Sequence, residues 1–149
     1  VSADARHYLP LGERLVVASR VQFGAINGRG DDPTQVPFSK KFFLGGATSI
    51  RGWGRFEVSP LGRSGLPIGG NTMAAFSSEL RLSSGGNLGG VLFFDGGNVW
   101  AGDWDVRLGE LRYAVGPGIR YQTPVGPIRF DLGYQLNPDP SLRVNGQPQ

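Results

Sequence analysis

The residues of this chain that could do chemistry are one arginine in a glycine-rich stretch and an acid on a later segment. Arg51 lies in the sequence I-R-G-W, and Asp95 interrupts the otherwise apolar run V-L-F-F-D-G-G-N-V-W. A lone carboxylate in an apolar core is unfavourable unless it is paired. A guanidinium can bind carboxylates in two directions, which an ammonium cannot do. The sequence therefore indicates an ion pair between Arg51 and Asp95.

Other kinds of site have little support in the sequence. The chain has no cysteine, which excludes disulfide frameworks and thiolate metal sites. The single histidine, His7, lies beside a tyrosine near a predicted strand end, and we assign it no catalytic role. The stretch G-G-N-L-G-G lacks the lysine and the helix of a phosphate-binding loop. We therefore expect no enzymatic activity, no cofactor and no metal.

Length and composition favour a single all-β domain. The chain has 149 residues, and its 25 glycines and 11 prolines are interleaved with aliphatic and aromatic residues in alternating order. The net charge is +3, but the basic residues are scattered, so a nucleic-acid surface is not indicated. No apolar run approaches the roughly 20 residues of a membrane helix. The lack of such a run does not exclude a transmembrane β-barrel, because only alternate residues of its strands face lipid.

Alternation of apolar and polar residues predicts five strands. These are Leu15–Ala25, Asn71–Ser83, Val91–Trp100, Leu111–Gln122 and Ile128–Leu136. The first eleven residues are predicted to be a strand end and a short turn, and residues 137–149 a polar loop or tail. Residues 84–90 are predicted to be a turn.

The two faces of these strands differ in polarity. One face is aliphatic or aromatic, and the other carries charges, several of them in the middle of a strand. The charged residues are Arg20, Glu79, Arg81, Asp95, Arg120, Arg129 and Asp131. A soluble β-sandwich alternates in the same way. However, strands of about 10–12 residues match a tilted bilayer span, and the connections alternate between short and long. These features favour a membrane barrel whose charged face lines the lumen.

The connection at residues 26–70 is the most unusual part of the chain. It is too long for a hairpin turn, and its glycines allow positive φ and close approach of backbones. Phenylalanines and Trp53 give it apolar side chains to bury. Long ordered loops in compact domains are usually functional. We expect this connection to fold back into the lumen and to place Arg51 on acids of the following strands.

Four ordered motifs resemble the BamA/TamA superfamily of outer-membrane assembly factors, the bacterial surface antigen domain. Ile50, Arg51, Gly52 and Trp53 resemble the (V/I)-R-G-(F/Y) motif of the sixth outer loop, and P-F-S-K-K-F-F-L-G-G resembles the TamA type of approach to it. I-G-G-N-T-M-A-A-F-S-S-E-L-R and F-F-D-G-G-N-V-W resemble the next two strands, and G-P-G-I-R-Y-Q-T-P-V-G-P-I-R-F-D-L-G resembles a late hairpin.

The resemblance implies a fold, a location and a function. The family Glu and Asp correspond to Glu79 and Asp95, so we expect Arg51 to pair with both on the inner wall and to lock the loop in the lumen. The alternative is a solvated Arg51, with Asp95 paired to Arg81 or Arg120. The implied function is protein insertion into, or translocation across, the bacterial outer membrane. The implied partners are the lipid bilayer and nascent outer-membrane or secreted proteins.

The sequence departs from the family pattern at two points. Trp53 replaces the usual Phe or Tyr, and the chain ends in P-Q rather than in an aromatic-ended strand. Residues 1–149 are thus expected to be the C-terminal part of a roughly sixteen-stranded barrel, lacking the final strand, most N-terminal strands and POTRA domains. Its open sheet edges are expected to self-associate. Two other barrels share the motifs, a two-partner-secretion translocator and the anchor of a patatin-like phospholipase; a soluble sandwich is the fourth possibility.

Overall fold

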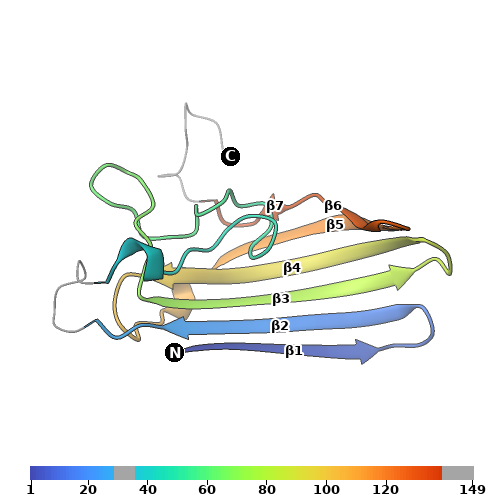
Figure 1. The fold of residues 1–149 in the computed structure, drawn as a ribbon, viewed down its shortest axis with the longest axis horizontal. Helices are drawn as coiled ribbons and strands as arrows, with labels where there is room; N and C mark the ends of the chain where they lie inside the picture. Colours follow the sequence, from blue (N-terminus) through green and yellow to red (C-terminus); the bar gives the residue numbers. More distant parts are fainter. Residues whose placement is uncertain (29–35, 139–149) are drawn as a thin grey trace.

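The protein is one antiparallel sheet with a long connection lying on it. The computed structural model describes residues 1–28 and 36–138. The strands are β1 (Ser2–Pro10), β2 (Leu15–Ala25), β3 (Thr72–Ser83), β4 (Leu88–Trp100), β5 (Arg112–Thr123), β6 (Gly126–Asp131) and β7 (Tyr134–Gln135). They follow chain order from β1 to β6, and β7 pairs with β5 (Figure 1). Short 3-10 turns occupy Phe38–Lys40 and Leu108–Glu110. Within these ranges, none of the helical segments has the length and apolarity needed to span a bilayer.

The prediction of an all-β antiparallel fold is confirmed. β2 has the predicted bounds, β3 begins one residue late, β5 is shifted by one residue at both ends, and β4 begins three residues early. The register places Ser77 opposite Asp95, and Ala18 opposite Glu79. The alternation of the sequence therefore translates directly into two faces of one sheet.

Three local predictions were wrong. The first eleven residues form a full strand, β1, whose backbone pairs with β2 along nine residues. The predicted turn at residues 84–90 is shorter, because the strand resumes at Leu88. The predicted strand Ile128–Leu136 is interrupted: β6 ends at Asp131, and only Tyr134–Gln135 pairs again with β5. Of the predicted C-terminal tail, residues 139–149 lie outside the described residues.

The connection between β2 and β3 lies over part of one face of the sheet, which we call the inner face (Figure 1). Within residues 36–70, the connection is bridged to itself at Leu44 and Val58 and at Leu61 and Pro67. It meets the sheet at Gly24, where an added Cβ would lie 2.6 Å from the ring of Phe42. The connection is thus an ordered second layer rather than an extended turn.

The hydrophobic core lies between this layer and the inner face. The connection contributes Leu44, Ile50, Trp53 and Val58, and the sheet contributes Ala75, Val99 and Ala114. The sheet side is made of small side chains, which leaves room for the large ones of the connection. Each large apolar side chain that is fully buried contributes about 1.5–3 kcal/mol. The folded position of the connection therefore rests first on apolar burial.

The opposite face of the sheet, which we call the outer face, exposes large apolar side chains. They include Leu80 and Leu82 of β3, Leu92 and Phe94 of β4, Ile119 and Tyr121 of β5, and Ile128 and Phe130 of β6. A contiguous apolar surface of this kind is unusual on a soluble monomer and marks a contact with lipid or protein.

We infer from its burial in the core that Trp53 contributes a large share of the free energy of unfolding. We expect Trp53→Ala to lower the free energy of unfolding by about 3–5 kcal/mol, because it removes a large side chain that is 3% exposed. Leu66→Ala, on the same connection but 66% exposed, is expected to change it by less than about 0.5 kcal/mol. Urea unfolding of the intact barrel in detergent micelles measures both, and equal effects would contradict this assignment.

Candidate functional site

The tip of the connection is held by its own hydrogen bonds. The amide of Gly45 donates to Ser49 Oγ at 2.8 Å, and the same hydroxyl donates to the Gly45 carbonyl at 2.9 Å. The amide of Gly46 donates to the Trp53 carbonyl at 2.9 Å. Ile50 and Trp53 are buried on either side of Arg51, and the Trp53 indole donates to the Tyr113 carbonyl at 3.3 Å. These contacts fix the direction in which Arg51 leaves the backbone.

Arg51 binds Asp95 of β4 with a planar, two-pronged contact. Its Nε donates to Oδ2 and its Nη2 to Oδ1, both at 2.8 Å. The backbone amide of Arg51 also donates to Oδ2, at 3.1 Å. Bidentate pairs of this kind are among the strongest side-chain interactions in proteins. Asp95 is fully buried, and its carboxylate would be unfavourable there without a partner. Arg51 is that partner.

The remaining N–H groups of Arg51 reach other side chains. Nη1 donates to Glu79 Oε1 at 2.5 Å and lies 3.6 Å from Asp131 Oδ2. Nη2 donates to Ser77 Oγ at 3.2 Å, and that hydroxyl donates to Asp95 Oδ1 at 2.6 Å. The guanidinium also lies 3.7 Å from the centre of the Phe93 ring, a cation–π contact. Strands β3, β4 and β6 therefore meet at one side chain.

The electrostatics of the site keep Arg51 charged. Burial alone would lower the pKa of its guanidinium, but the hydrogen bonds and ion pairs with Asp95 and Glu79 outweigh burial and raise the pKa above its ordinary value. Arg51 is 6% exposed, so breaking the pair would leave charges in a poorly solvated place. Losing one partner of a buried pair typically costs about 3–5 kcal/mol.

Further arginines surround the acids and complete a network. Arg81 contacts Glu79 at 2.6 Å, Arg120 contacts Asp131 at 2.5 Å, and Arg129 lies 3.6 Å from Asp131. Arg129 also donates to the Ala47 carbonyl at the tip of the connection. Glu79 and Asp131 are thus each shared between cations, whereas Asp95, among the described residues, pairs with Arg51 alone. The tip is tied to β6 as well as to β3 and β4.

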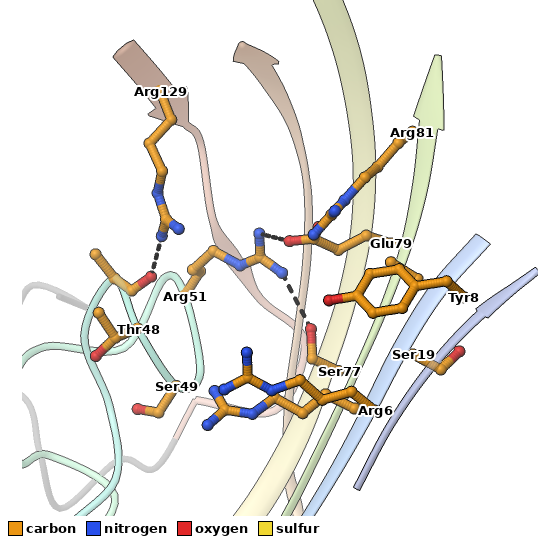
Figure 2. A pocket seen from close by; sticks show the side chains of 13 residues that line it. Arg6, Tyr8, Ser19, Thr48, Ser49, Arg51, Ser77, Glu79, Arg81 and Arg129 are labelled. Atoms are coloured by element: carbon orange, nitrogen blue, oxygen red, sulfur yellow. Dashed lines mark hydrogen bonds and ion pairs between the residues drawn. The ribbon is translucent and has the colours of Figure 1, made fainter. Parts of the chain in front are cut away.

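Figure 2 shows the recess beside this network, with a volume of ≈ 210 Å³. Arg6 and Tyr8 of β1 line one side, Thr48 and Ser49 of the tip line another, and Arg51 reaches across between them. In the part of the chain that the structure describes, no three His, Cys, Asp or Glu side chains are grouped so as to hold a metal ion. The charged groups around the recess hold segments of the chain together.

The predicted residues come together, and the network contains more than was predicted. Arg51, Glu79 and Asp95 are in direct contact, and Arg81, Arg120, Arg129 and Asp131 adjoin them. In the alternative arrangement Asp95 would pair with Arg81 or Arg120, but these two contact Glu79 and Asp131. Sequence reasoning missed Ser77 and Phe93. Ser77 lies two residues before Glu79, and Phe93 lies two residues before Asp95. Each therefore shares the face of its strand with a predicted acid, and this spacing could have indicated both residues.

A backbone contact joins the tip to the interrupted strand. Gly52 has φ of +90°, and a Cβ built on it would lie 2.8 Å from the carbonyl carbon of Gly133. Gln135 Nε2 donates to the Gly52 carbonyl at 2.9 Å. Only glycine allows this approach, and Gly133 lies between β6 and β7, where the strand breaks.

Comparison with known proteins identifies related sequences. Residues 1–145 match the Omp85 superfamily domain. The chain is 35% identical over 139 residues to outer membrane protein assembly factor BamA of Nitratidesulfovibrio vulgaris strain Hildenborough, covering 87% of this chain and 17% of that protein. It is 25% identical over 171 aligned residues to the protein of the same name from Neisseria meningitidis serogroup B, covering 92% of this chain and 21% of that protein.

Comparison with solved structures identifies the fold. The crystal structure of BamA from Haemophilus ducreyi lacking POTRA domains 1–3 superposes with a TM-score of 0.78 at 22% sequence identity. The match covers 94% of this chain and 32% of that one. The sheet is therefore a fragment of a barrel, and the chain spans about a fifth of the length of its curated relatives.

The Gly52–Gly133 contact predicts that Gly52→Ala loosens the tip. Gly65 is the matched control, because it also has positive φ (+74°) but nothing lies within 4 Å of its added Cβ. Both substitutions strain the backbone, and only Gly52→Ala pushes the tip away from Gly133. We expect it to lower the free energy of unfolding by about 1–3 kcal/mol more than Gly65→Ala does. Urea titration measures both, and equal losses would mean that the contact contributes nothing.

Proposed function

The chain belongs to the Omp85 superfamily, and from this we propose that it forms the C-terminal strands of an outer-membrane barrel that assembles or inserts other proteins. The whole of residues 1–149 belongs to this barrel, and residues 26–70 are its inward-folded loop. The rest of the barrel and POTRA domains are the expected neighbours in the same protein. The clients are nascent outer-membrane or secreted proteins.

The two faces of the sheet support a place in the membrane. The outer face exposes aliphatic and aromatic side chains such as Leu92, Ile119 and Phe130. The inner face carries the arginines and carboxylates of the Arg51 network. β2 to β5 have 11 to 13 residues each, enough for a tilted strand to cross a bilayer. Apolar outward and polar inward is the pattern of an outer-membrane barrel.

The observation that carries the proposal furthest is the buried contact of Arg51 with Asp95 and Glu79. We propose that it locks the loop inside the lumen and braces the wall formed by β3, β4 and β6. The site has no turnover role in this account, because the arginine and its acids occupy one another's hydrogen-bonding groups.

We place the chain among the assembly factors and assign no subtype. The approach P-F-S-K-K-F-F-L-G-G resembles the TamA type, whereas both curated relatives are named BamA. A translocator barrel or a phospholipase anchor would carry the same lock, so the assay of function must follow the assembly of other proteins rather than the stability of the barrel.

The lock predicts graded effects at Arg51. We expect Arg51→Ala to lower the free energy of unfolding by about 3–5 kcal/mol, because it leaves Asp95 buried without its partner. Arg51→Lys keeps the charge but loses the two-pronged contact, so its loss should be smaller. The amount of folded outer-membrane protein in cells that depend on the variant measures function, and it should fall in the same order.

The control for these variants is Arg63→Ala, which removes an exposed arginine from the same connection. It should leave both stability and assembly unchanged. If Arg51→Ala lowers stability but assembly stays normal, the lock serves only the fold. If neither changes, the proposed role of Arg51 is wrong.

A further inference from the structure

The connection between β4 and β5, at residues 101–111, contacts both ends of the long connection. The contacts lie at the base of that connection, away from its tip. We propose that Asp103 is a positioning residue that clamps the two ends of the long connection together and so holds the Arg51 tip over its acids. The proposal rests on the proposed function only in taking the Arg51 contact as the arrangement that must be maintained.

Asp103 uses its two carboxylate oxygens for the two ends. Oδ2 accepts a hydrogen bond from the backbone amide of Gly28, three residues after β2, at 2.8 Å. Oδ1 accepts from Nδ2 of Asn71, the residue before β3, at 2.7 Å. One side chain therefore joins the start and the end of a connection of more than forty residues. Hydrogen bonds to a charged acceptor are stronger than those between neutral groups.

The end near β3 is buried and held by polar contacts. Asn71 and Thr72 are 3% and 0% exposed. The backbone amide of Asn71 donates to the Trp100 carbonyl at 3.0 Å, and the Thr72 hydroxyl donates to the Gly102 carbonyl at 2.8 Å. The backbone carbonyl of Asn71 accepts a hydrogen bond from the backbone amide of Ile26 at 2.7 Å. This bond places the end of the connection near β2 next to the end near β3. Buried polar groups need such partners, so the base has little freedom to rearrange.

Trp104 adds an aromatic contact to the same clamp. Its backbone has φ of +57°, an unusual value for a bulky residue. In this conformation its ring lies 5.9 Å from that of Phe23 on β2, and its indole nitrogen donates to the Asn27 side chain. Uncommon backbone conformations persist where surrounding contacts determine them. Neighbouring residues 103 and 104 therefore both turn toward the end of the connection that follows β2.

Holding the two ends together limits the positions open to the tip. The entropy lost when a loop is closed rises with its length, and a clamp at the base removes part of that freedom independently of the tip. Arg51 then meets Asp95 and Glu79 from a loop whose ends are already fixed. The clamp acts at the base of the long connection, and the Arg51 contact acts at its tip. Loosening the clamp should therefore expose the connection while the barrel stays folded.

The test exchanges the donor and the acceptor of the clamp. In Asp103→Asn, an amide replaces the carboxylate, so one of its two acceptor sites is lost. In Asn71→Asp, two carboxylates face each other. The double variant restores one donor and one acceptor between the two positions. Asp105→Asn is the matched control, because Asp105 lies on the same connection but pairs with Arg107 at 2.9 Å.

The readout is tryptic cleavage after Lys40, Lys41 and Arg63 in the intact barrel in detergent micelles. Cleavage follows the population of the opened loop when opening is fast. We expect Asp103→Asn and Asn71→Asp each to raise the cleavage rate about tenfold, as the loss of one hydrogen bond to a charged group implies. Asp105→Asn should cleave like the wild type.

The double variant should recover part of the protection. Its amide at position 103 can donate to the new carboxylate at position 71, which reverses the direction of the original hydrogen bond. The second oxygen of that carboxylate takes the place of Asn71 Oδ1, a buried atom for which the described residues supply no hydrogen-bond partner. The exchange therefore leaves no additional donor without an acceptor, although it places a charge in a buried position, so recovery is expected to be partial.

The outcomes separate this inference from the proposed function. Recovery in the double variant, with the folded fraction on semi-native gels unchanged in all variants, supports a positioning clamp. If Asp103→Asn cleaves no faster than Asp105→Asn, or the double variant cleaves as fast as the faster single variant, the clamp is wrong. Neither result depends on assembly of client proteins, and a failed assembly assay for Arg51 would leave the clamp standing.

Discussion

A guanidinium can be buried only where acceptors take up its N–H groups. The inner face of this sheet supplies those acceptors to Arg51. Asp95 receives two of its side-chain bonds and one from its backbone amide, while Glu79 and Ser77 receive the others. These partners come from two strands separated by a turn and from a connection far from either. If the register of β3 and β4 slipped by one residue, the acids would face outward. The ion pair and the sheet register therefore require each other.

The ion pair sets the position of the tip, and apolar packing supplies most of the stability. Ile50 and Trp53 are buried on each side of Arg51 against small residues such as Ala75 and Ala114. Buried ion pairs on their own are often no better than apolar replacements of the same volume. What the pair adds is a single direction and depth of insertion, because the bidentate geometry with Asp95 admits few alternatives. In the barrel that we propose, this selectivity would keep the loop in one shape inside the lumen.

Alternating polarity was sufficient to predict β2 to β5 and which of their side chains share a face, because a strand has a period of two residues. It also put Arg129 and Asp131 on the same face as Glu79 and Asp95, but it did not predict that they adjoin the Arg51 contact. It failed at β1, whose residues are all exposed and carry no apolar stripe, and at the break after Asp131. That break coincides with a backbone contact between Gly52 and Gly133, which are far apart in sequence. The clamp of Asp103 on Gly28 and Asn71 was equally invisible, because hydrogen bonds between connections leave no periodic signal.

In our proposal, Arg51 holds the tip of the connection against the inner face. The most direct test is the distance between two spin labels, one at Thr48 on the tip and one at His7 on β1, in the intact barrel. The chain has no cysteine of its own that would take a label. We expect a narrow distribution of distances with Arg51 present and a broad distribution at longer distances with Arg51→Ala. The same narrow distribution in both proteins would contradict it.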